Sequence, residues 1–79
     1  MTDDQALAMI KAALEKTTPG LSAKVTPDVH LIKDKIIDSL DSMNFLFELE
    51  QLHGGQLEAI DETFDDFRVI RLIQILQTA

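Results

Sequence analysis

A long stretch without helical periodicity, residues 17–37, constrains the fold of this sequence more than any other feature. It contains Pro19, Gly20 and Pro27, which interrupt helices. It also carries seven aliphatic residues, namely Leu21, Val25, Val29, Leu31, Ile32, Ile36 and Ile37. A loop this long is uncommon in a small domain unless it packs its own apolar residues or has a function. We therefore expect it to be pinned onto a helical core, with a short helical turn near residues 27–31.

Three segments around this loop place apolar residues at helical spacing. They predict helices over about residues 3–16, 40–53 and 67–77. At the start of the first helix, Thr2 and Gln5 have the spacing of a capping box, in which two side chains satisfy free backbone N–H groups.

Polar residues and glycine mark the ends of the later helices. Asp38 or Ser39 can cap the second helix, and Gly54 ends it. The acidic residues 61–66 can form a short helix, and Asp66 can cap the last one. The predicted fold is all-α: a small four-helix bundle of three longer helices and one short helix, with the long loop between the first and second helices.

The absence of cysteine excludes a disulfide, a cysteine-based zinc site and a thiol nucleophile. The length of 79 residues suits a single domain, residues 1–79, with a small core. The first residues are acidic and lack an apolar signal core, and no apolar run approaches the roughly 20 residues that cross a bilayer. We therefore expect a cytoplasmic protein that does not insert into membranes and acts as a monomer.

The charge of the chain is unevenly distributed. Residues 34–66 hold ten acidic residues and one basic residue, Lys35, whereas the rest of the chain is slightly basic and the whole carries −7. Such a segment repels nucleic acid and anionic lipid, and it attracts partners with basic patches. We expect no nucleic acid partner. A plainer interpretation is that the acidic residues keep a small helical protein in solution.

The predicted second helix is apolar on two nearly opposite sides. One side carries Phe45, Leu46, Leu49 and Leu52. The other carries Leu40, Met43 and Phe47. The first set suits the core, but the second has two interpretations. Loop residues Ile36 and Ile37 can cover it, or Met43 and Phe47 can stay partly exposed as a docking patch with an acidic rim.

Little in the sequence points to catalysis. His30 and His53 are the only histidines, and no Gly-x-Ser-x-Gly turn or glycine-rich phosphate loop is present. The acidic residues 61–66 do not have the spacing of a calcium loop. We expect that the chain is not an enzyme.

Ser39 follows Asp38 where the loop becomes a helix, a position at which the helix dipole favours an attached phosphate. Serine at such a position is most often only a cap. However, residues 38–41 read Asp-Ser-Leu-Asp, which resembles the phosphopantetheine attachment motif of the acyl carrier protein family. The resemblance extends to the long loop before this motif, the amphipathic helix after it, the acidic stretch and the apolar last helix.

This resemblance implies a carrier that holds acyl groups as thioesters on a covalent 4'-phosphopantetheine arm, which a phosphopantetheinyl transferase moves from coenzyme A onto Ser39. The motif residues flanking that serine are Asp38, Leu40 and Asp41. The residues implied in partner binding are Met43, Asn44, Phe47 and Glu50. The implied partners are acyl ligases, synthases and acyltransferases with basic docking patches. Phe45, Leu46, Leu49 and Ile70 would line an inner cavity that shelters cargo.

Three departures from the family pattern bear on the pathway. Residues 35–37 read Lys-Ile-Ile where the family often has a glycine, Asn44 stands where glutamate is common, and the proline that often precedes the third helix is missing. A specialised lipid or polyketide pathway is therefore as plausible as general fatty acid synthesis. Two alternatives stay open: an aminoacyl or peptidyl carrier, and an unmodified acidic helical adaptor that binds a basic partner. Ser42 is a poorer attachment candidate than Ser39, because choosing it shifts the helix out of register with the family.

Overall fold

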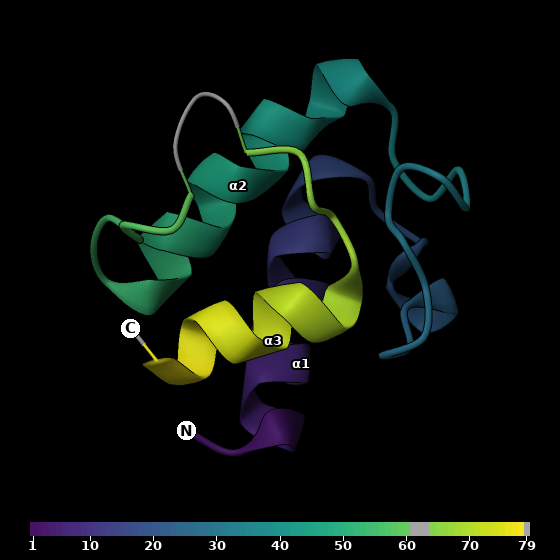
Figure 1. Cartoon of the computed structure of the whole chain (residues 1–79). Helices are drawn as coiled ribbons and strands as arrows, with labels where there is room; N and C mark the ends of the chain where they lie inside the picture. The colour runs from purple at the N-terminus through teal and green to yellow at the C-terminus, as the bar shows by residue number, and fades with distance from the viewer. Residues whose placement is uncertain (61–63, 79) are drawn as a thin grey trace.

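The computed structural model of the chain describes residues 1–60 and 64–78. Its elements are α1 (Asp3–Thr17), a short 3-10 helix η1 (Ser22–Lys24), α2 (Ser39–His53) and α3 (Val69–Thr78). Helix α1 packs against both α2 and α3, and the long loop runs along one side of the three helices (Figure 1). Within the described residues there is no strand, only one isolated bridge. The all-α fold predicted from the sequence is confirmed.

The predicted start of α1 and the predicted end of α2 are confirmed. Thr2 and Gln5 form the capping box of α1: the Gln5 N–H donates to the Thr2 hydroxyl at 3.1 Å, and the Thr2 N–H donates to the Gln5 side chain at 2.9 Å. Helix α2 ends at Gly54, which has a φ of 97°. Glycine adopts this left-handed conformation without the steric conflict that a side chain brings, so the helix stops there.

The start of α3 differs from the prediction. The helix begins at Val69 rather than Phe67, and Asp66 does not cap it. The Asp66 carboxylate instead binds the Arg68 side chain at 2.7 and 2.8 Å. Phe67 and Arg68 stay extended because they pair with the long loop: the Leu31 N–H donates to the Phe67 carbonyl at 2.9 Å, beside the bridge between His30 and Arg68.

The long loop is pinned onto the core, as expected. Val25, Leu31, Ile36 and Ile37 are buried. The predicted helical turn near residues 27–31 is present but shifted along the chain. The Val29 N–H closes a turn with the Thr26 carbonyl at 3.2 Å, and one helical turn follows at residues 30–34, where the Asp34 N–H donates to the His30 carbonyl at 2.9 Å. The same stretch also pairs with a distant segment, because the Val69 N–H donates to the Val29 carbonyl at 3.0 Å.

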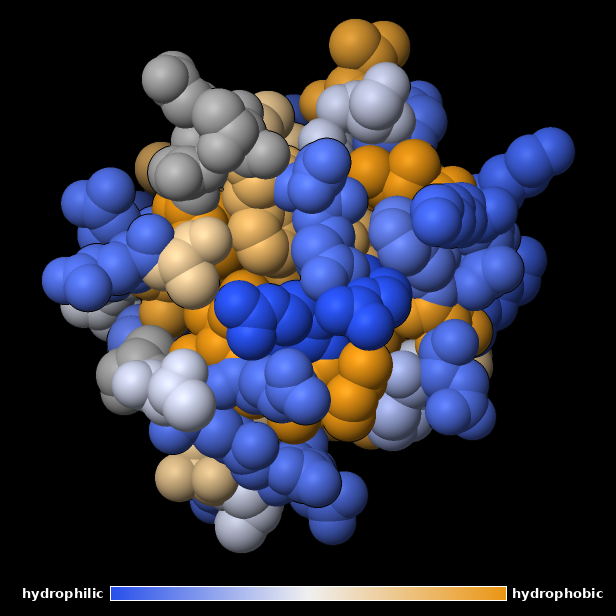
Figure 2. Space-filling model, viewed as in Figure 1, coloured by the Kyte–Doolittle hydropathy of each residue, from blue (hydrophilic) through white to orange (hydrophobic). Residues whose placement is uncertain are grey.

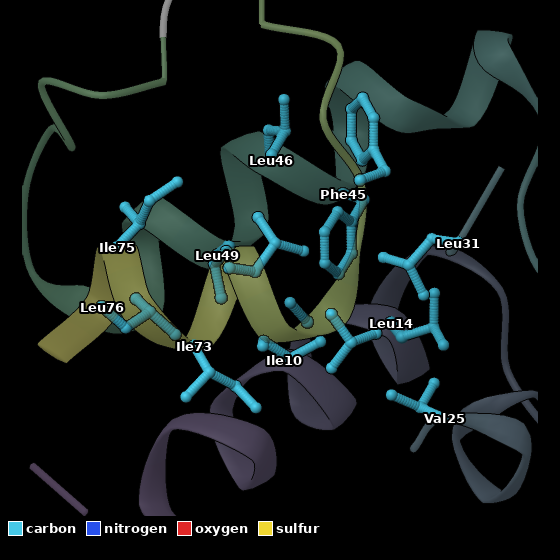
Figure 3. Packing of buried hydrophobic residues seen from close by; sticks show 14 of the residues in the cluster. Ile10, Leu14, Val25, Leu31, Phe45, Leu46, Leu49, Ile73, Ile75 and Leu76 are labelled. Atoms are coloured by element: carbon cyan, nitrogen blue, oxygen red, sulfur yellow. The ribbon is translucent and has the colours of Figure 1, made fainter. Parts of the chain in front are cut away.

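The core lies where the three helices meet (Figure 3). Phe45 and Leu49 of α2 are fully buried, and they lie among Ile10 and Leu14 of α1 and Ile73 of α3. The expected core side of α2 is therefore confirmed. The expectation that Ile70 lines an inner cavity is wrong, because this side chain is 41% exposed on the outer face of α3.

The predicted short helix over residues 61–66 falls partly outside the described residues, since residues 61–63 are not among them. Residues 64–66 are not helical. Phe64 packs edge to face against Phe67, with 5.4 Å between ring centroids. In the part of the chain that the structure covers, no helix has the length and apolar character needed to cross a membrane.

Candidate functional site

Two neighbouring residues at the start of α2, Asp38 and Ser39, have different environments. Asp38 is the N-cap, and its carboxylate accepts the Asp41 N–H at 2.8 Å. Ser39 is the first residue of the helix and is exposed. No residue within 1–60 or 64–78 makes a hydrogen bond with the Ser39 hydroxyl. The capping role that the sequence left open between these residues belongs to Asp38, so the cap of α2 does not use the Ser39 hydroxyl.

Ser42, the other serine near the start of α2, is in a different environment. It is 7% exposed, and its hydroxyl donates to the Ser39 carbonyl at 2.7 Å. A hydroxyl that is buried and already hydrogen-bonded is a poor target for an enzyme that must reach it from outside. Of the two serines, only Ser39 presents an accessible oxygen.

The electrostatics around Ser39 combine a positive helix end with acidic and basic side chains. The first turn of α2 directs its backbone N–H groups and the positive end of the helix dipole toward this residue, which favours an attached phosphate. Asp38 and Asp41 flank it on the helix, and Lys35 lies four residues earlier on the loop. Two acidic side chains therefore flank Ser39 on the helix, and the basic side chain of Lys35 lies on the preceding loop.

Ser39 and residues of the loop line an open groove of about 590 Å³. It is lined by Thr18, Leu21, Ile32, Lys35, Ile36, Ile37, Asp38, Ser39 and Asp41. Sequence reasoning did not assign Thr18, Leu21 or Ile32 to the site. Thr18 and Leu21 come from the other end of the loop, and only the folding of the loop brings them to the groove. Lys35 could have been singled out from the sequence, because it lies in the stretch where acyl carrier proteins often have a glycine. Its φ of 59° lies in the left-handed region that glycine prefers.

The second apolar side of α2 is exposed. Leu40, Met43 and Phe47 are 84%, 57% and 59% exposed. The interpretation that Ile36 and Ile37 cover this side is wrong, because both are buried in the core instead. In Figure 2, hydrophobic atoms project at the edge of the molecule where α2 begins. We call Leu40, Met43 and Phe47 the α2 patch.

Two further residues predicted for partner binding lie on the same helix. Asn44 is exposed next to Met43. Glu50 is only partly exposed, and its carboxylate accepts the Leu57 N–H at 2.8 Å, which fixes the segment that follows α2. Glu50 therefore has a structural role that the sequence did not reveal, because its partner lies seven residues away in an irregular segment.

Of the two histidines, His53 has a buried Nδ1 with no hydrogen-bond partner among the described residues, whereas His30 has a role in the fold. His30 Nδ1 accepts the N–H groups of Ile32 and Lys33 at 3.2 and 3.1 Å, so this histidine shapes the turn. Within the described ranges, no three histidine, aspartate or glutamate side chains gather to hold a metal ion. The hydrogen bonds from Arg68 lower the pKa of Asp66 to about 2, which marks a local ion pair.

Comparison with known proteins gives one informative similarity. The chain is 23% identical over 73 residues to acyl carrier protein 2 of Ralstonia nicotianae, and the alignment covers 92% of this chain and 84% of that protein. No family model matches the chain. No solved structure matches it significantly. The aligned region spans nearly the whole chain, so the similarity is not confined to one short motif.

Proposed function

We propose that this chain, which is acyl-carrier-protein-like over nearly its whole length, holds acyl intermediates on a 4'-phosphopantetheine arm attached to Ser39. The observation that carries the proposal is the division of roles at the start of α2: Asp38 caps the helix, and the exposed Ser39 hydroxyl has no hydrogen-bond partner among the described residues. A serine whose hydroxyl is not used by the fold is suited to modification.

The residues at the start of α2 are suited to holding a phosphopantetheine group. Attachment requires an accessible hydroxyl, and a helix N-terminus stabilises the phosphate that results. In the transfer step, Ser39 Oγ would form a bond to the phosphorus that carries pantetheine in coenzyme A. The bond from that phosphorus to the adenosine bisphosphate leaving group would break, and the hydroxyl proton would leave with a base of the transferase. The attached arm would supply a thiol, which the chain itself lacks, to hold acyl groups as thioesters.

The chain's own residues would orient the visiting enzymes. Asp38 and Asp41 flank the serine and offer negative charge to a basic transferase, and Leu40 adds exposed apolar surface beside them. Met43 and Phe47 continue this surface along α2, with Asn44 between them. Apolar anchors inside an acidic rim suit synthases, ligases and acyltransferases that carry basic patches. Glu50 would contribute charge at the far end of this surface.

The cargo class follows from the family resemblance alone, and fatty acyl, polyketide or specialised lipid intermediates all fit it. An aminoacyl or peptidyl carrier would use the same serine and the same arm. Loading the modified chain in parallel with fatty acyl and amino acid ligases would separate these two cargo classes. The exposed α2 patch also suits an unmodified adaptor, which would bind a basic partner without using the Ser39 hydroxyl.

The test is modification of the purified chain. We would incubate it with coenzyme A and a promiscuous phosphopantetheinyl transferase, and weigh the intact protein. The proposal expects a mass gain of one phosphopantetheine group, which Ser39→Ala abolishes and Ser42→Ala retains. No mass gain in the folded wild-type chain would contradict the proposal and favour the adaptor.

A further inference from the structure

We infer that, once attached, the phosphate and dimethyl part of the arm lies in the groove on the loop side of Ser39, with the Lys35 ammonium paired with the phosphate. This inference rests on the proposed function and adds to it a bound position for the arm. It assigns a role to loop residues, Leu21 and Ile32 among them, that neither the attachment motif nor the α2 patch requires.

The shape of the groove supports this position. Ser39 is one of the residues that line the groove, so a group attached to its oxygen starts next to it. The volume of about 590 Å³ lies within the range of small-molecule sites. Leu21 and Ile32 are partly buried against the core and contribute to its walls. The two methyl groups of pantetheine lie next to the phosphate along the arm, and aliphatic walls would remove them from water.

The charges of the groove support the same position. Lys35 is the one basic residue among those that line it. It takes part in neither of the ion pairs found among residues 1–60 and 64–78, which join Lys16 to Glu48 and Arg68 to Asp66. Asp38 and Asp41 lie on the helix side of the groove and would repel a phosphodiester. Lys35 on the loop side offsets that repulsion, so it favours placing the phosphate toward the loop.

The backbone at Lys35 fits a functional role for this side chain. A φ of 59° is strained for lysine and free of strain for glycine. The positive φ ends the turn at residues 31–35, where the Ile36 N–H donates to the Leu31 carbonyl at 3.0 Å. Lysine is not needed for this turn, and its exposed side chain is available to an attached phosphate.

The experiment compares unmodified and modified chains by two-dimensional amide NMR, with modification verified by intact mass. We expect the amide signals of Leu21, Ile32 and Lys35 to shift on modification, in addition to those of the first turn of α2. In Lys35→Glu most of the shift at Leu21 and Ile32 should be lost, and the phosphorus resonance of the arm should move. Lys33→Glu is the matched control, since Lys33 is exposed on the same loop and does not line the groove. It should retain the wild-type shifts.

The possible results separate this inference from the proposed function. A wild-type chain that gains no mass overturns both. A chain that gains the mass but shows shifts only near residues 38–42 overturns the groove position and leaves the attachment intact. Equal loss of the loop shifts in Lys35→Glu and Lys33→Glu also overturns the specific role of Lys35. Both variants change exposed side chains, and the amide spectrum of the unmodified form verifies that each is folded.

Discussion

The Asp38 carboxylate accepts the backbone N–H of Asp41 at 2.8 Å, and this contact caps α2 without using Ser39. A capping side chain satisfies a backbone donor that has no partner within the helix. Because Asp38 performs this task, the neighbouring hydroxyl is not needed for stability. The arrangement separates two properties that a single serine at a helix start would combine, namely holding the helix and offering a reactive oxygen.

Asp38→Ala and Ser39→Ala should therefore have different effects on stability. Removing the cap in Asp38→Ala should lower the free energy of unfolding by about 1 kcal/mol. Ser39→Ala should change it by less than about 0.5 kcal/mol, as for exposed side chains without partners. Urea unfolding of the unmodified proteins measures both. A loss in Ser39→Ala as large as that in Asp38→Ala would show that the serine is the cap.

The α2 patch should determine how fast the chain is modified. Met43→Ala and Phe47→Ala each remove an exposed apolar anchor that we propose contacts the transferase. A truncated anchor costs more than about 1 kcal/mol of interaction, so kcat/KM for modification should fall roughly fivefold or more. Stability should be nearly unchanged. Ile70→Ala is the control, because Ile70 is exposed on α3 outside the patch. An equal fall in Ile70→Ala would argue against a specific docking surface.

Lys35→Gly should stabilise the unmodified chain. A residue with a side chain in the left-handed region costs about 1–2 kcal/mol, whereas glycine loses about 0.5–1 kcal/mol in extra chain entropy. The net gain in the free energy of unfolding should be about 0.5–1 kcal/mol. Lys33→Gly has no positive φ to relieve and should be neutral or destabilising. Thermal or urea unfolding measures the free energy of unfolding of both variants. A Lys35→Gly variant less stable than wild type would mean that the lysine side chain stabilises the loop.

Asp66 should make stability depend on pH in acid. The hydrogen bonds from Arg68 lower its pKa from the ordinary 3.8 to about 2 in the folded chain. Its contribution is therefore present above about pH 4 and disappears as the pH falls through about 2. Asp66→Asn should be less stable than wild type near neutral pH, with the difference closing at low pH. Asp65→Asn is the charge-matched control, and an equal effect there would point to general charge rather than to this pair.

Features set by neighbouring residues could be predicted from the sequence. The capping box of Thr2 and Gln5, the end of α2 at Gly54 and the two apolar sides of α2 all depend on spacing within a few residues. The resemblance of residues 38–41 to an attachment motif also lies in the local sequence. The structure confirmed the start of α1 and the end of α2, and it showed that the second apolar side of α2 is exposed.

Features set by distant pairing could not be predicted. The helical turn expected near residues 27–31 lies at residues 30–34, and the backbone at Val29 and Leu31 pairs with Val69 and Phe67, about forty residues away. The same pairing delays the start of α3, and the contact between Glu50 and Leu57 depends on the path of an irregular segment. The groove at Ser39 was missed for a similar reason, since Thr18 and Leu21 reach it only through the folding of the loop.

Localising the modification in the wild-type chain tests the central claim most directly. After reaction with coenzyme A and the transferase, the chain would be digested and the peptide holding residues 38–43 fragmented by mass spectrometry. The account predicts that the added phosphopantetheine is on Ser39, whose hydroxyl is exposed and unbonded among the described residues. A modified Ser42, or an unmodified peptide from a chain shown to be folded, would contradict it.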